Sequence, residues 1–226
     1  MGIGTTVNLH FEVLPSETQQ ALNVLREFQY IRNTQWYLAG GTALALQVGH
    51  RQSVDLDFFT TQADFDIAIL ERQLLYLGNW STTFTEQGTL YGELHGAKVS
   101  FIANASFTPA IERVHHGAIA MLLPADIAVM KVMAISQRGK KRDFIDLYWY
   151  CTQSEYKETV ATVVQRAIQQ YSTQQDHMIH LLKSLVYFAD AETDPMPQLM
   201  FAVDWLQVQQ YFERKVTKII RSIEVS

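Results

Sequence analysis

The chain has 226 residues, of which 48% are hydrophobic and 18% are charged. This length suits one large domain or two modest ones, and the composition excludes a disordered or low-complexity protein. The 23 acidic residues outnumber the 18 lysines and arginines, which argues against a broadly basic protein that coats nucleic acid. Residues 1–120 hold the whole acidic excess, with 11 acidic and 6 basic side chains, so any contact with a polyanion would be local.

The only cysteine, Cys151, excludes an internal disulfide and a cysteine-based zinc site. It lies in an apolar run, which favours a buried structural thiol over a nucleophile. No segment approaches the roughly 18–20 apolar residues that span a bilayer, and the first residues lack the basic and apolar regions of a signal peptide. We therefore expect a cytoplasmic protein with no membrane contact.

Hydrophobic spacing and turn residues predict alternating helices and strands in the first part of the chain. A capping-box pattern predicts a helix over residues 16–31, with Ser16 at its start. Residues 36–39 predict a short buried strand that ends at two glycines, and residues 42–49 suit a short helix. Apolar and acidic residues alternate over 54–59, which predicts a strand with both carboxylates on one face.

The remaining sequence changes from strands to helices. A helix is expected over residues 64–77, and residues 81–104 predict several strands joined by tight turns. From Pro124 onward the pattern is helical, over residues 124–138, 142–152, 155–171, 177–189 and 198–223. The sequence therefore predicts an α+β fold (mixed α/β), with a core over residues 1–122 and a helical region over residues 123–226.

Two motifs can carry phosphate chemistry: Gly40-Gly41-Thr42 and Asp55-Leu56-Asp57. A Gly-Gly turn before a helix lets backbone N–H groups approach a phosphate, and the Thr42 hydroxyl adds a donor or an N-cap. Asp55 and Asp57 would repel each other unless water or a hard cation such as Mg²⁺ lies between them. These parts suit phosphoryl or nucleotidyl transfer. An ordinary turn beside a wet edge strand would explain the same residues, and the residues alone leave both interpretations open.

A second group of charged side chains follows on the predicted helices. Lys131 lies among apolar residues, where its ammonium either extends to water or reaches a triphosphate. Four of the five residues 138–142 are basic. Such a run is typical either of a solvated loop or of a segment that contacts a phosphate backbone. Asp143 suits a helix cap, whereas Asp146 lies too deep in the helix for that role.

Other polar residues give weaker signals. His115 and His116 have no partners at metal-ligand spacing and are expected at the surface or in a turn. His177 and His180 lie three residues apart on a helix without a suitably spaced carboxylate, so no metal site is expected there. The basic residues of 214–221 suit a polar helix face, or a contact with a partner or RNA.

Four segments, in their order and spacing, resemble the AbiEii/AbiGii-type nucleotidyltransferase toxins. They are Leu38–Leu46, Gly49–Phe59, Lys131–Arg138 and Arg142–Tyr148. The resemblance covers about residues 36–150. It implies a nucleotidyltransferase fold of the DNA polymerase β type, with a helical region that completes the active-site cleft.

The resemblance also implies roles for individual residues. Asp55 and Asp57 would hold Mg²⁺, or Mn²⁺ in its place, and the later acidic motif falls on Asp143 and Asp146. The nucleotide-binding residues would be Gly40, Gly41, Thr42, Arg51, Ser53 and Lys131. Such proteins are the toxin halves of bacterial toxin–antitoxin or phage-defence pairs, and some transfer nucleotides to tRNA ends. The implied substrate is therefore an NTP, and the implied partners are RNA and an antitoxin protein.

Two positions depart from the family pattern. Thr42 stands where relatives often have serine, and it keeps the hydroxyl. Ser100 falls on the strand that carries a third carboxylate in the wider superfamily, and a serine can neither act as that base nor bind a metal as a carboxylate does. Glu93 would need a different register, so Asp143 or Asp146 would substitute, or transfer would be slow or lost. An impaired binding module is therefore the alternative function, and an RNA-binding protein is a third.

Overall fold

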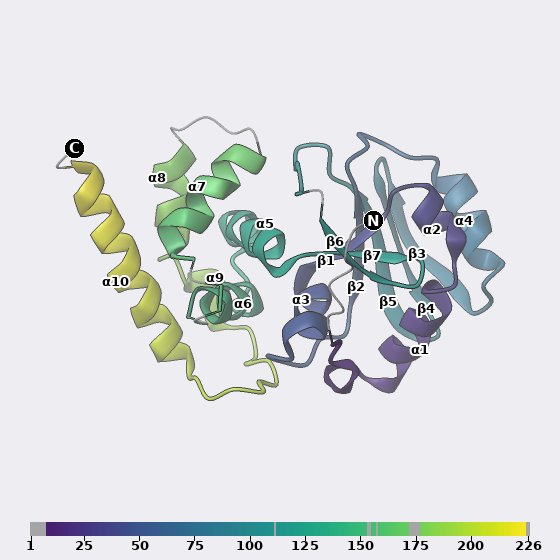
Figure 1. Ribbon diagram of the computed structural model, residues 1–226, viewed down its shortest axis with the longest axis horizontal. Helices are drawn as coiled ribbons and strands as arrows, with labels where there is room; N and C mark the ends of the chain where they lie inside the picture. Colours follow the sequence, from purple (N-terminus) through teal and green to yellow (C-terminus); the bar gives the residue numbers. More distant parts are fainter. Residues whose placement is uncertain (1–7, 111, 153–154, 157, 172–176, 225–226) are drawn as a thin grey trace. The chain divides into compact units, whose positions relative to one another are not determined.

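The computed structural model describes residues 8–110, 112–152, 155–156, 158–171 and 177–224. The chain forms two compact units, Met1–Leu123 and Pro124–Ser226, which we call the sheet unit and the helical unit. Figure 1 shows the strands gathered in the first unit and only helices and loops in the second. The α+β class expected from the sequence is confirmed.

The described part of the sheet unit forms a mixed seven-stranded sheet in the order β3-β4-β5-β2-β1-β7-β6. Its strands are β1 (Tyr37–Ala39), β2 (Leu56–Thr60), β3 (Trp80–Glu86), β4 (Thr89–Leu94), β5 (Ala97–Ala103), β6 (Arg113–His116) and β7 (Ile119–Leu122). Strand β2 is antiparallel to β1 and parallel to β5, and β1 is parallel to β7. The centre of the sheet is thus built from segments that are far apart in the sequence.

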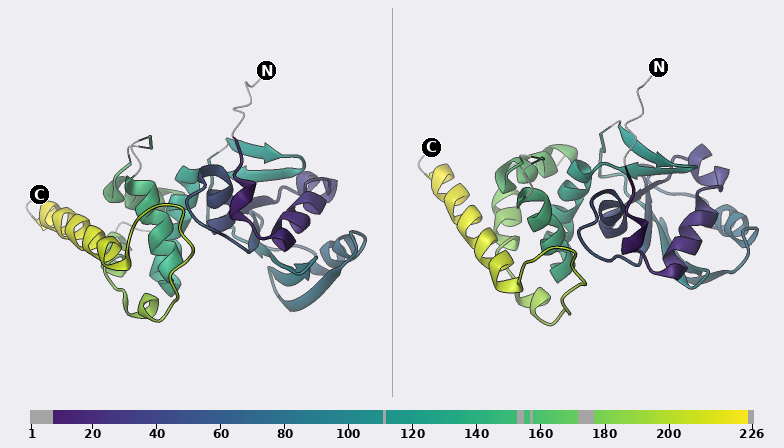
Figure 2. Two further views of the ribbon diagram at one scale, coloured as in Figure 1. Left: turned by 90° about the horizontal axis from the view of Figure 1, so that it is seen from below. Right: turned by 60° about the horizontal axis from the view of Figure 1, so that its bottom comes forward.

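Helices cover the two faces of the sheet unequally (Figures 1 and 2). Helices α1 (Ser16–Leu25), α2 (Gln29–Asn33) and α4 (Ile67–Leu75) lie on one face, and α3 (Gly40–Val48) lies on the other. A short 3₁₀ turn, η1 (Phe11–Val13), precedes α1. Strand β2 alternates accordingly, because Leu56 and Phe58 are fully buried while Asp57 and Phe59 are partly exposed.

The first predicted helix is wrong in two respects. It ends at Leu25, and a separate helix starts at Gln29, because Phe28 adopts an extended backbone between them. The N-cap of α1 is Pro15 rather than Ser16, and no side chain caps the helix. The predicted strand at residues 36–39 and the strands of residues 81–104 form as expected, as β1 and β3 to β5.

The segment after Asn104 contains two strands that the sequence analysis missed. Strands β6 and β7 form an antiparallel pair, and β7 joins β1. His115 and His116 therefore lie in strand β6 rather than in a turn, with His115 exposed and His116 partly buried. Strand β6 contains only one apolar residue, and β7 is a short apolar run that periodicity alone does not distinguish from a helical segment.

The described part of the helical unit consists of helices and loops, including the loop of residues 193–204 before the last helix. The helices are α5 (Pro124–Arg138), α6 (Lys141–Thr152), α7 (Val160–Gln170), α8 (His177–Ser184), α9 (Ala189–Glu192) and α10 (Trp205–Glu224). Helices α7 and α10 start later than predicted, because Thr159 and Asp204 accept backbone N–H groups at their first turns. Among the described helices, none has the length and apolar character needed to cross a bilayer.

Candidate nucleotide site

The junction of β1 and α3 brings the glycine motif against a carboxylate. Gly40 is the first residue of α3 and has a φ of +70°, which residues with side chains rarely adopt. A Cβ atom added to Gly40 would lie 3.1 Å from Asp57 Oδ2. The register explains this proximity, because Ala39 pairs with Asp57 across the β1–β2 ladder. The start of the helix and the Asp57 carboxylate therefore share one small space.

Strand β5 holds Asp57 from its other side. Ser100 pairs with Asp57 in the parallel β2–β5 ladder, and Ser100 Oγ donates a hydrogen bond of 2.7 Å to Asp57 Oδ1. Glu93 is exposed on β4 and pairs with Lys98, so it does not lie beside Asp57. The neighbour of Asp57 on this strand is a hydroxyl, and no carboxylate takes its place in this register.

The Thr42 hydroxyl fixes the segment that carries Asp55. Thr42 Oγ1 lies 2.8 Å from Ser53 Oγ and contacts the backbone carbonyl oxygen of Asp55. A carbonyl only accepts, so both contacts are satisfied when Thr42 donates to Asp55 and accepts from Ser53. The N-cap of α3 is Ala39, so of the two roles expected for Thr42, a donor or an N-cap, the second is wrong. Asp55 precedes β2, so the observed strand contains only one of the two carboxylates that were predicted to share it.

Arg51 and Ser53 lie on the segment that leads from α3 to β2, and both side chains are buried. Arg51 Nη1 donates to the backbone carbonyl of Gln52 over 2.8 Å, and the Ser53 N–H donates to the Val13 carbonyl over 3.1 Å. A buried guanidinium keeps its positive charge. These hydrogen bonds fix the backbone conformation of the segment that precedes Asp55.

The donors in the sheet unit suit a metal that a substrate helps to bind. Within the described ranges, no group of three or more His, Cys, Asp or Glu side chains converges on one point. Asp55 and Asp57 supply two carboxylates, and Mg²⁺ is commonly held by one or two carboxylates together with phosphates and water. The missing Cβ of Gly40 leaves room beside Asp57 Oδ2. This donor set fits Mg²⁺ or Mn²⁺ bound together with a triphosphate.

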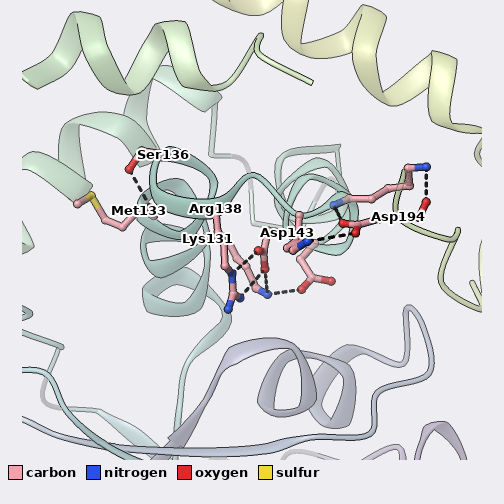
Figure 3. Close-up of polar contacts among 9 residues, drawn as sticks. Lys131, Met133, Ser136, Arg138, Asp143 and Asp194 are labelled. Carbon is pink, nitrogen blue, oxygen red and sulfur yellow. Dashed lines mark hydrogen bonds and ion pairs between the residues drawn. The ribbon is translucent and has the colours of Figure 1, made fainter. Parts of the chain in front are cut away.

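In the helical unit, Lys131 and two aspartates form a buried ion-pair cluster, which Figure 3 shows. Lys131 Nζ lies 2.7 Å from Asp143 Oδ1 and 2.7 Å from Asp146 Oδ2, and Arg138 Nε lies 3.1 Å from Asp143 Oδ2. The side chain of Lys131 is 5% exposed, and those of the two aspartates are 0% exposed. Lys131 therefore does not extend to water, which was one of its two predicted alternatives. The cluster pairs two positive with two negative charges.

The charges around Asp143 keep its carboxyl ionised. Burial alone would raise the pKa of Asp143, because the carboxylate loses its hydration. The Lys131 and Arg138 cations outweigh this effect, and the pKa of Asp143 lies below its usual value. A carboxylate with a lowered pKa is a poor proton acceptor. Asp143 is thus better suited to holding Lys131 than to replacing the third catalytic carboxylate.

The basic run of residues 138–142 is not a single solvated loop. Lys141 is buried, and its Nζ donates to the Asp194 carbonyl over 2.6 Å and lies 5.2 Å from the centre of the Trp205 ring. Lys140 Nζ lies 3.3 Å from Asp194 Oδ1. Sequence reasoning missed Asp194, whose only signal was an acidic residue in a loop with two prolines. Arg138, Lys140 and Lys141 all contact other groups of the helical unit, so at least three of the four cations in the run make internal contacts.

Other candidate residues have ordinary structural roles. Burial raises the pKa of the Cys151 thiol to about 12, so the thiolate is scarce at neutral pH and the prediction of a structural thiol fits. His177 and His180 are exposed on α8. The basic residues of α10 are also exposed, as expected for a polar helix face: Arg214, Lys215, Lys218 and Arg221.

Comparison with known proteins gives the family. The model of the nucleotidyl transferase AbiEii toxin, from a type IV toxin–antitoxin system, matches residues 24–221. The chain belongs to this family. An uncharacterized protein of Aquifex aeolicus (strain VF5) is 34% identical to the AbiEii-family chain over 193 residues, which are 83% of this chain and 89% of the relative. The family resemblance is confirmed, and it extends beyond residue 150 to the last helix.

Two solved structures share the fold of the AbiEii-family chain. The nucleotidyltransferase toxin MenT4 of Mycobacterium tuberculosis H37Rv has a TM-score of 0.53 at 12% identity, covering 89% of this chain and 84% of MenT4. A protein of H. pylori, assigned as a nucleotidyltransferase, has a TM-score of 0.53 at 16% identity, covering 93% of this chain and 97% of its own. At these identities the comparison shows a nucleotidyltransferase fold.

Proposed function

We propose that this AbiEii-family protein is a Mg²⁺-dependent nucleotidyltransferase that transfers NMP from an NTP to a hydroxyl of RNA, in particular tRNA, or of a protein. A bond forms between the α-phosphorus and the acceptor oxygen, the bond to pyrophosphate breaks, and the hydroxyl proton passes to water or a base. The protein would act in the cytoplasm as the toxin of a toxin–antitoxin or phage-defence pair, with an antitoxin protein as its partner.

The observation that carries this proposal is the approach of Gly40 to Asp57. Gly40 has a left-handed backbone and no Cβ atom, and a Cβ atom added there would lie 3.1 Å from Asp57 Oδ2. The space left by the absent Cβ would let a phosphate oxygen meet the proposed metal-binding carboxylate. The first N–H groups of a helix attract phosphate through their unpaired hydrogens and the helix dipole. Gly40 and Gly41 would therefore hold the triphosphate, and Asp55 and Asp57 the metal.

The buried residues beside this motif would support it rather than react. Thr42 fixes Asp55 and Ser53 through its hydroxyl, and Arg51 adds a buried positive charge to the same segment. These contacts keep the carboxylate of Asp55 in place as the metal and nucleotide arrive. We therefore propose that these residues support nucleotide binding indirectly. Thr42 and Ser53 would fix the shape of this segment, and Arg51 would supply its positive charge.

We propose that Lys131 contacts the triphosphate. An ammonium has three donors, and Asp143 and Asp146 each accept one bond from Lys131. Fixed in this way, Lys131 loses little conformational entropy when it binds a phosphate. Asp143 and Asp146 would then be positioning residues that act through Lys131.

A catalytically impaired nucleotide-binding module is the second candidate, and Ser100 is the observation that favours it. By the family resemblance, Ser100 would stand where the wider superfamily has a third carboxylate, and its hydroxyl donates to Asp57. An acceptor hydroxyl would then have to lose its proton to water, which slows transfer. A slow transferase and an inactive module differ only in whether product forms.

A transfer assay separates these candidates. The full chain is incubated with Mg²⁺, each α-³²P-labelled NTP, and tRNA, total RNA or lysate protein. We expect a labelled product with at least one NTP, a loss of about 100-fold in Asp57→Asn, and no change in Glu93→Gln. Labelling that survives Asp57→Asn would contradict the proposal. Mg²⁺-dependent NTP binding by calorimetry without any product would identify the impaired module.

A further inference from the structure

Four side chains form a row across the sheet that starts at the candidate metal site. Asp57 on β2 pairs with Ser100 on β5, Ser100 pairs with Tyr91 on β4, and Tyr91 pairs with Phe84 on β3. Residues directly opposite each other on neighbouring strands point to the same face of a sheet. All four side chains therefore lie on one face, which we call the Asp57 face.

A β-bulge turns Phe84 onto this face. Thr82 pairs with Gly92 and Phe84 pairs with Tyr91, so Thr83 is one extra residue in β3. Thr82 lies on the opposite, helix-covered face, where its hydroxyl donates to Glu71 of α4. Simple alternation would place Phe84 on the same side as Thr82. The bulge reverses that direction, as bulges beside functional sites often do.

The two aromatic rings at the end of the row are half exposed and lie together. Phe84 is 46% exposed and Tyr91 is 40% exposed, and their ring centres are 5.6 Å apart. A single exposed apolar residue is ordinary and needs no explanation. A pair of rings in one row with Asp57 is different, because the two rings, whose planes are tilted by 35°, together offer an apolar surface on the face that carries the proposed metal ligand.

We propose that Phe84 and Tyr91 form a stacking platform for the bases of a single-stranded RNA end whose hydroxyl is the acceptor. This inference rests on the proposed function, and it selects RNA over protein as the acceptor. Neighbouring strands are about 4.8 Å apart, which puts the two rings about 10 and 14 Å from Asp57 along the row. Stacked nucleotides rise about 3.4 Å each, so the rings would meet bases about three or four nucleotides from the reacting hydroxyl.

The charges near the rings favour base stacking over contacts with the phosphate backbone. Residues 1–120 hold 11 acidic and 6 basic side chains, and on the Asp57 face Glu93 pairs directly with Lys98. Such a surface gains little from releasing the counterions of a polyanion. Aromatic rings stack on the faces of bases of any sequence, which is a contact that needs no basic side chain. A peptide acceptor carries no regular series of flat rings, so it would not use both side chains.

The test measures binding of a short fluorescein-labelled single-stranded RNA with a free 3′ hydroxyl by fluorescence anisotropy. We expect Phe84→Ala and Tyr91→Ala each to weaken binding at least fivefold, and the double variant more. Tyr76→Ala is the matched control, because Tyr76 is 78% exposed and directly follows α4, on the other face of the sheet. An abasic strand of the same length should bind the parent protein as weakly as the RNA binds the double variant.

The outcomes separate this inference from the proposed function. Equal RNA affinity in the parent and the double variant, or equal affinity for the abasic strand, overturns the platform whatever the transfer activity. Label that goes only to protein, with no RNA binding by the parent, also overturns it. Ring-dependent RNA binding without any transfer supports the platform and counts against the proposed function alone.

Discussion

Ser100 Oγ donates a 2.7 Å hydrogen bond to Asp57 Oδ1, and Asp57 Oδ2 faces the start of α3 at Gly40. The two oxygens of one carboxylate therefore have different neighbours. The hydrogen bond fixes the rotation of the carboxylate, which directs the second oxygen toward the proposed phosphate site. Ser100 thus orients the carboxylate that we propose as a metal ligand, although it cannot act as a base.

Removal of this hydrogen bond should weaken the metal site without unfolding the protein. Hydrogen bonds to charged groups contribute about 1.5–3 kcal/mol, so Ser100→Ala should reduce transfer about tenfold or more and raise the Mg²⁺ concentration needed for half-maximal rate. Ser100→Thr keeps the hydroxyl and suits a strand, so it should retain activity. An unchanged Mg²⁺ dependence in Ser100→Ala would show that Ser100 does not orient Asp57.

A side chain at Gly40 should affect activity more than stability. Gly40→Ala would adopt an unfavourable positive φ, at a cost of about 1–2 kcal/mol, and would also press on Asp57 Oδ2. Gly78 is the matched control, since its φ is +75° and an added Cβ there meets nothing within 4 Å. Urea unfolding should show similar losses of stability in both variants, while only Gly40→Ala loses transfer. Full activity in Gly40→Ala would contradict the crowded phosphate site.

Loss of the Lys131 ammonium should destabilise the helical unit. Lys131→Met would leave the buried carboxylates of Asp143 and Asp146 without their shared cation, at a cost of about 3–5 kcal/mol. Lys140→Met breaks a partly exposed pair with Asp194 and should cost about 1 kcal/mol or less. Free energies of unfolding from urea titrations compare the two variants. Equal losses would show that the buried cluster does not carry the expected charge interactions.

The lowered pKa of Asp143 predicts a stability loss only in acid. A carboxylate with a lower pKa in the folded state stabilises the protein above its unfolded pKa of about 4, and this contribution disappears as the pH falls through the folded value. Urea midpoints should therefore be flat near neutral pH and decrease below about pH 4. Asp143→Asn should show a shallower decrease over the same acid range, and an identical slope would contradict this origin.

The Cys151 thiol should react slowly in the folded protein. With a pKa of about 12, only about one thiol in ten thousand is a thiolate at pH 8. A thiol reagent such as Ellman's reagent should therefore modify the native protein far more slowly than the protein unfolded in urea. Rapid modification of the native protein would show that Cys151 is not protected by burial.

Local sequence features predicted the parts of the fold and site that depend on neighbours in the chain. The apolar run before Gly40 predicted β1, and the alternation of apolar and polar residues around Asp57 predicted β2. Glycines and polar turns marked the hairpins of residues 81–104. These features act within a few residues, so the sequence displays them directly.

The parts that sequence analysis missed depend on distant partners. The contact of Lys141 with Asp194 joins residues that are 53 positions apart. The row from Asp57 to Phe84 depends on strand registers and on the bulge at Thr83. Periodicity gives the side of one strand but not the strand it will pair with, so these relations required the folded structure.

The proposed nucleotide site is tested most directly by a crystal structure of the full chain soaked with Mn²⁺ and a non-hydrolysable NTP. We expect an anomalous peak bound by the carboxylates of Asp55 and Asp57, with the triphosphate against the backbone of Gly40 and Gly41 and the Lys131 ammonium on a phosphate oxygen. A nucleotide or metal bound elsewhere, with these two carboxylates making no contact to either, would contradict it.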